Sequence, residues 1–141
     1  AGALLVCSEE AIKRYGFTPL ARYDGFAVRG VPPEIMGIGP KEAIPAVLKS
    51  SGRTLADIKW MELNEAFAAQ ALAVIRDLDL DTNIVNPNGG AIALGHPLGA
   101  TGAIRAATVI HGMRERGETG YGMVTMCIGT GMGAAGLIEV L

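Results

Sequence analysis

The uneven distribution of glycine constrains the fold of this 141-residue chain more than any other feature of its sequence. Two stretches, residues 89–102 and residues 129–136, are especially rich in the 20 glycines. Glycine has no side chain to keep a neighbouring group away, so a chain that gathers glycine in two places brings its backbone close to something there. We therefore expect these stretches to meet a ligand or another segment of the chain.

The composition excludes several classes of protein. Half of the residues are hydrophobic and 18% are charged, which supports a folded core and excludes disorder. The net charge of −2 offers no basic excess for nucleic acid, and no apolar run is long enough to span a membrane. Two cysteines form neither a disulfide framework nor a zinc set. We expect one domain, residues 1–141, in the cytoplasm or, in a eukaryote, in an organelle matrix.

Strand and helix patterns alternate along the chain. Helices are expected at residues 9–15, 41–50, 65–79 and 97–116, and strands at residues 21–28, 60–63, 122–126 and 134–141. Asn64 is placed to cap the helix at 65–79, which is apolar nearly all round and is expected to lie inside the protein. The helix at 97–116 has a face of small residues suited to close packing. The alternation, ending in a hairpin, predicts an α/β layered domain with a mixed sheet.

Three polar residues lie where a strand or loop meets glycine or a helix start, namely Asn64, His96 and Cys127. Ligands of open α/β sheets usually bind at such places. Each residue also has a structural alternative: Asn64 as a helix cap, His96 as a loop histidine bonded to backbone, and Cys127 as a small buried hydrophobe. Taken together, with glycine on both sides of two of them, the three favour a site.

The chemistry of such a site is coherent. His96 precedes Pro97 at a helix start, where the helix dipole disfavours an imidazolium ion, so a neutral ring there can accept a proton or polarise a carbonyl. Cys127 precedes a glycine-rich turn whose backbone N–H groups suit a thiolate or an oxyanion. No metal site is expected, because His96 and His111 are far apart and lack a carboxylate companion. Glu65 is expected to serve the first turn of its own helix.

Other glycine motifs do not fit. The stretch 95–102 lacks the Gly-Lys-Ser/Thr ending of a phosphate-binding loop. The run at 129–133 is followed by an expected strand, not by the helix that a dinucleotide-binding fingerprint requires.

Three motifs together resemble the C-terminal signatures of thiolases, which are acetyl-CoA acetyltransferases and 3-ketoacyl-CoA thiolases. They are Asn64-Glu65-Ala66-Phe67-Ala68, the run from Asn88 through Gly95-His96-Pro97 to Gly102, and Cys127-Ile128-Gly129-Thr130-Gly131. The resemblance implies a thiolase-like half with a five-stranded mixed sheet and helices on both faces. It also implies that the nucleophilic cysteine and most of the coenzyme A loop domain belong to an N-terminal half absent from these residues, since Cys7 matches no nucleophile motif.

The resemblance implies a role for each matching residue. His96 would activate the absent nucleophile and, with Asn64 acting through a water, bind the thioester oxygen. Cys127 would be the general acid/base at the α-carbon, and the N–H of Gly129 would help form a second oxyanion hole. The pantetheine and acyl pocket would be lined by Met36, Ala66 and Phe67.

As a whole, the resemblance implies an acyltransferase of fatty-acid metabolism and β-oxidation that needs no metal or cofactor, since acyl-CoA and CoA are its substrates. The full-length enzyme would be a homodimer or homotetramer, and these residues alone would be inactive. Two alternatives stay open. A β-ketoacyl synthase would be expected to have histidine in place of Cys127 and Gly-His-Thr in place of Gly95-His96-Pro97. The other alternative is a non-catalytic lipid-binding or assembly module of the same fold.

Overall fold

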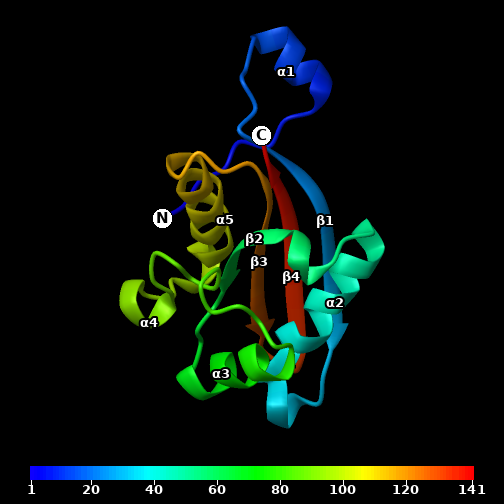
Figure 1. Cartoon of the computed structure of the whole chain (residues 1–141), viewed down its shortest axis with the longest axis vertical. Coiled ribbons are helices and arrows are strands. Elements are labelled where there is room, and N and C mark those ends of the chain that lie inside the picture. Colours follow the sequence, from blue (N-terminus) through cyan, green and yellow to red (C-terminus); the bar gives the residue numbers. More distant parts are fainter.

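The computed structural model describes residues 1–141 and is built around one mixed sheet of four strands (Figure 1). The strands are β1 (Ala21–Gly30), β2 (Ile58–Leu63), β3 (Gly120–Ile128) and β4 (Met132–Val140), in the order β1-β4-β3-β2. Strand β4 is antiparallel to both of its neighbours, whereas β2 and β3 are parallel. The predicted α/β class and mixed sheet are confirmed.

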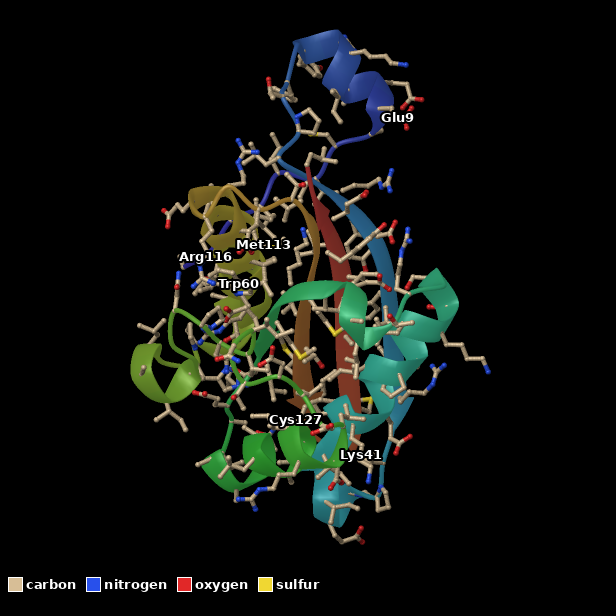
Figure 2. The ribbon with its side chains drawn as sticks, viewed as in Figure 1. Glu9, Lys41, Trp60, Met113, Arg116 and Cys127 are labelled. Carbon is tan, nitrogen blue, oxygen red and sulfur yellow. The ribbon has the colours of Figure 1, made fainter.

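Helices cover both faces of this sheet. Helix α2 (Gly39–Ser51) packs on β1, β4 and β3, and α5 (Leu98–Glu115) packs on β3, β2 and β4. Alternate residues of β2 serve the two faces: Met61 and Leu63 join the cluster under α2, and Trp60 joins the cluster under α5. Figure 2 shows Trp60, Met113 and Arg116 gathered at α5, where the Arg116 guanidinium lies 4.4 Å from the centre of the Trp60 ring.

The expected fifth strand does not form. The sheet has four strands, and the segment before the first glycine-rich stretch forms only a single parallel bridge, between Met61 and Val85. Met61 N–H donates to Ile84 O at 2.8 Å and Asn86 N–H donates to Met61 O at 2.8 Å. The ladder ends there because Asn86 turns into a left-handed backbone conformation, with φ 47°. Five strands was therefore wrong for this chain.

The helix after β2 also differs from its prediction. Helix α3 spans Ala68–Asp77 and begins after Phe67, so Asn64 does not cap it. It is also not an interior helix, because only Gln70, Ala71 and Val74 are buried and Leu72 is 48% exposed. A lysine–aspartate pair at 2.8 Å, Lys41 with Asp77, joins it to α2.

Close backbone approaches account for part of both glycine-rich stretches. A Cβ on Gly133 would lie 2.0 Å from the carbonyl carbon of Gly39, so β4 and the start of α2 touch through their backbones. A Cβ on Gly90 would lie 2.3 Å from the Glu65 carboxylate. Both stretches do meet other segments of the chain, as expected.

Helix α1 (Glu9–Tyr15) and its flanking residues project from the top of the molecule in Figure 1, whereas the N-terminus itself lies beside α5. The helix has the expected boundaries: the Ser8 hydroxyl accepts from the Ala11 N–H, and Gly16 closes the helix with φ 67°. No residue of α1 is buried. None of the helices is both long and apolar enough to cross a membrane.

Candidate active site

The candidate residues gather at the end of the sheet where β2 and β3 finish. Because these strands are parallel, their carboxyl ends meet at one edge. Asn64 follows β2 directly, and its N–H donates to Thr125 O of β3 at 2.9 Å. Cys127 lies two residues further along β3, at the lower end of that strand in Figure 2. Strand pairing therefore brings two of the predicted residues to one edge.

The third predicted residue reaches Asn64 from a different segment. His96 precedes α5, and its Nε2 lies 3.3 Å from Asn64 Nδ2. On the other side of the ring, Nδ1 lies 2.8 Å from Thr101 Oγ1. The Asn64 amide N–H donates to Nε2, so Nε2 presents its lone pair and Nδ1 carries the proton that it donates to Thr101. These two contacts fix the orientation of the ring from both sides.

Asn64 has a side-chain acceptor that is left without a hydrogen bond. Its side chain is buried, with 1% of the residue exposed, yet its Oδ1 accepts no hydrogen bond. A buried acceptor without a donor costs free energy, so such atoms are usually functional or bind a small polar group. Thr101, also 1% exposed, was not singled out from the sequence. Its signal was a hydroxyl in the first turn of the helix that follows a candidate histidine.

Glu65 binds two other segments of the chain and not the helix that follows it in sequence. Its Oε2 accepts from the Ile92 N–H at 3.0 Å, and its Oε1 accepts from Asn86 Nδ2 at 3.1 Å. Ile92 lies in the first turn of α4 (Ala91–Leu94), a short helix not predicted from the sequence. The expectation that Glu65 serves its own helix was therefore wrong, because it stabilises the N-terminal end of another one.

Cys127 is half-buried, and burial raises the pKa of its thiol above the ordinary value. The thiol is therefore the stable form at neutral pH. No hydrogen bond joins Cys127 to His96 or Asn64. The other cysteine, Cys7, lies two residues before α1 in the sequence, and α1 is at the end of the molecule opposite this edge (Figure 1).

The turn between β3 and β4 begins at Gly129, which is exposed. Its N–H donates to no acceptor within the chain, so this donor is free. Thr130 and Gly131 complete the turn with φ 72° and 94°, and Gly131 O accepts from the Val31 N–H at 2.8 Å. This hydrogen bond anchors the turn to the segment that leads into residues 33–38, which include the predicted pocket residue Met36.

The three predicted pocket residues lie on two neighbouring segments. Met36 is half-buried in η1, a 3₁₀ segment (Pro33–Ile38), and Ala66 and Phe67 precede α3. The two segments pack closely, since a Cβ on Gly37 would meet Gln70 Cγ at 2.7 Å. Phe67 is 62% exposed, so no other part of residues 1–141 covers most of its ring. No cluster of three metal-ligating side chains occurs in the chain.

Comparison with known families decides the relationship. The model of the thiolase C-terminal domain matches residues 17–140. The chain belongs to the thiolase family. A 3-ketoacyl-CoA thiolase of Bacillus subtilis (strain 168) is 56% identical to it over 140 residues, which are 99% of this chain and 36% of that protein. The prediction from the three motifs is confirmed.

Solved thiolase structures share the fold. Human mitochondrial 3-ketoacyl-CoA thiolase in complex with CoA superposes with a TM-score of 0.91 at 51% identity, covering 95% of this chain and 34% of that one. The dimeric peroxisomal thiolase of Saccharomyces cerevisiae gives a TM-score of 0.86 at 53% identity, covering 92% of this chain and 33% of that one. The chain thus spans about a third of the length of these thiolases.

Proposed function

We propose that these residues are the C-terminal catalytic part of an acyl-CoA thiolase, which catalyses reversible Claisen condensation and thiolytic cleavage of 3-ketoacyl-CoA. The acyl group would be carried by a cysteine outside residues 1–141. The observation that carries the proposal is the line Asn64–His96–Thr101, at 3.3 and 2.8 Å, beside the carboxyl end of the strand that bears Cys127. An imidazole fixed from both sides, a free acceptor and a protonated thiol at one sheet edge suit proton transfer next to a thioester.

His96 acts first in the thiolytic direction. Its Nε2 takes the proton from the nucleophilic thiol while Thr101 Oγ1 accepts from Nδ1–H and fixes the ring. The thiolate attacks the 3-keto carbon, and the bond between that carbon and the α-carbon breaks. Asn64, acting through a water, and His96 then stabilise the enolate oxygen of the departing acetyl-CoA. The Asn64 Oδ1 that lacks a donor supports such a water-mediated contact.

Cys127 completes this half of the reaction. Its thiol donates a proton to the enolate α-carbon, giving acetyl-CoA and leaving a thiolate. The pKa of Cys127, raised by burial, favours the protonated starting state. CoA then attacks the acyl-enzyme thioester, and its thiol proton returns to the Cys127 thiolate. The C–S bond to the nucleophilic cysteine breaks, and the released thiolate regains its proton from His96 Nε2. The free N–H of Gly129 stabilises the tetrahedral oxyanion of this second step.

The binding groups follow from the same proposal. The exposed Phe67 ring, with Met36 and Ala66, lines the pantetheine and acyl pocket. The substrates are acyl-CoA and CoA, and no step requires a metal or another cofactor. We infer that the full-length protein is a homodimer or homotetramer located in the cytoplasm or an organelle matrix, supported by relatives described as dimeric, mitochondrial and peroxisomal.

The test uses a full-length thiolase in which residues 1–141 form the C-terminal part. Labelled acyl-CoA and a rapid quench count acyl groups on the protein, and a second assay counts product. Cys127→Ala should still be acylated, while product formation falls by roughly 10²–10⁴-fold. His96→Ala should be acylated slowly, and Asn64→Ala should lose less activity than either, because a water can partly reposition.

Cys7→Ala is the matched control and should behave like the parent, because Cys7 lies far from this edge. Residues 1–141 alone should give no product above a no-protein blank. If the Cys127 variant cannot be acylated while the His96 variant acylates normally, the two roles are reversed. A parent enzyme that binds acyl-CoA but is never acylated would instead favour the non-catalytic lipid-binding module.

A further inference from the structure

A fully buried ion pair lies between the sheet and α5, next to the segment that bears His96. Arg105 Nη1 of α5 donates to Glu62 Oε2 of β2 at 3.1 Å, and the two side chains are 3% and 0% exposed. Trp60, two residues earlier on the same face of β2, donates from Nε1 to Glu62 Oε1 at 2.7 Å. Both carboxylate oxygens are therefore satisfied, and Glu62 is held rigidly in the core.

The guanidinium does more than pair with Glu62. Nη1 also reaches Gly89 O at 3.3 Å, and Nη2 reaches Gly95 O at 3.4 Å. These two carbonyls lie on either side of α4, and Gly95 O belongs to the peptide bond that leads into His96. One side chain of α5 thus contacts the backbone at both ends of the segment before the candidate base.

The Gly95 peptide has a conformation that needs such support. Its backbone lies at φ 97° and ψ 164°, a region that residues with a side chain seldom occupy. A Cβ at Gly95 would meet nothing within 4 Å, so glycine is required there for its backbone angles and not for space. An uncommon conformation persists when the surrounding contacts fix it, and the Arg105 contact to Gly95 O is such a contact.

We propose that Arg105, held by Glu62, is a positioning residue that fixes the Gly95–His96 peptide and so aims His96 Nε2. A buried ion pair alone gives little net stability, and well-packed apolar side chains of similar volume often replace one without loss. Apolar side chains cannot donate hydrogen bonds to two carbonyl oxygens. The inference rests on the proposed function, because it assumes that His96 is the base that activates the nucleophile.

The test replaces the pair by an apolar pair in the full-length enzyme, as Glu62→Leu with Arg105→Met. The double variant should melt below the parent, because the buried Trp60 Nε1–H loses its acceptor, and its acylation rate constant should fall about 10–100-fold. Half-saturation with acyl-CoA should not change, because neither side chain belongs to the proposed pocket. The single variant Arg105→Lys, which keeps the charge but not the planar fork, should acylate faster than the double variant and more slowly than the parent. Arg114→Ala, an exposed arginine of the same helix, should match the parent.

Gly95→Ala tests the same inference without touching the pair. Its methyl group has room, so the change acts through the backbone, and acylation should slow in the same range while half-saturation stays constant. A folded double variant that acylates within twofold of the parent overturns the proposal. If the double variant does not fold, normal acylation by Gly95→Ala overturns it. Failure of the parent itself to be acylated would refute the proposed function, whereas normal variants beside an active parent refute only the positioning role.

Discussion

The side chain of Asn64 faces His96 instead of the helix that follows it in sequence. From local sequence alone, an asparagine before an apolar helical pattern is interpreted as a cap. The contact that decides otherwise joins residues 64 and 96, and local spacing carries no information about it. The three motifs together did predict that Asn64 and His96 share a site. Arg105 was missed because its partner, Glu62, becomes apparent only after α5 is placed on the sheet, whereas Thr101 lies five residues from His96 and its hydroxyl was a local signal.

At Cys127, burial has a measurable consequence for stability. The pKa of this thiol is raised in the folded chain, so as pH rises past the ordinary thiol range the unfolded chain loses its proton first. The free energy of unfolding should therefore decrease with rising pH more steeply with Cys127 than without it. Urea unfolding of the Cys7→Ala chain between pH 7 and pH 10, with and without Cys127→Ala, measures the difference. Parallel pH curves would contradict the expected shift.

At the scale of single elements, α5 has glycines in two different environments. A Cβ at Gly112 would lie 2.4 Å from the Trp60 ring, whereas one at Gly102 would meet nothing within 4 Å. The alanine change improves helix propensity equally at both positions. Gly112→Ala should nevertheless destabilise the chain by about 1–3 kcal/mol through overpacking, and Gly102→Ala should stabilise it by about 0.5–1 kcal/mol. Chemical denaturation of both variants measures this, and equal effects would contradict the packing described at Trp60.

Sequence patterns predicted those elements whose signals are local. Helix α1 has its cap at Ser8 and its end at Gly16, and the hairpin of β3 and β4 follows its glycine-rich turn. The short helix α4 was missed because the carboxylate at its N-terminal end comes from Glu65, far away in the sequence. The fifth strand came from the resemblance and not from a pattern in these residues. Only the bridge at Val85 lies in that region of the sheet.

At the scale of the whole molecule, large apolar side chains are exposed at several places, and the three most exposed lie before α1 and at the start of α5. Leu5 and Val6, before α1, are 77% and 84% exposed, and Leu98, at the start of α5, is 80% exposed. The same region as Leu98 includes two further residues of α4, Ile92 and Leu94. Contiguous apolar exposure of this kind typically marks an interface.

Residues 1–141 on their own should therefore bind a dye specific for exposed apolar surface, and they should self-associate. Replacing Ile92, Leu94 and Leu98 by glutamine should lower dye binding with little change in the free energy of unfolding, because these side chains have few contacts to lose. Dye fluorescence and light scattering measure both effects. A monomeric chain that leaves the dye dark would count against a surface that another part of the protein covers.

The central position of β4 determines when this domain can assemble during protein synthesis. Its residues pair with both β1 and β3, and Ala21 near the start of the chain is aligned with Val140. While a ribosome is still making α5 and β3, the strand that joins the two halves of the sheet does not yet exist. Until residue 140 has been added, β1 and β3 each present an unpaired edge to other nascent chains. Such long-range pairing makes folding slow, so chaperone protection during translation matters more here than for a domain assembled from neighbouring strands.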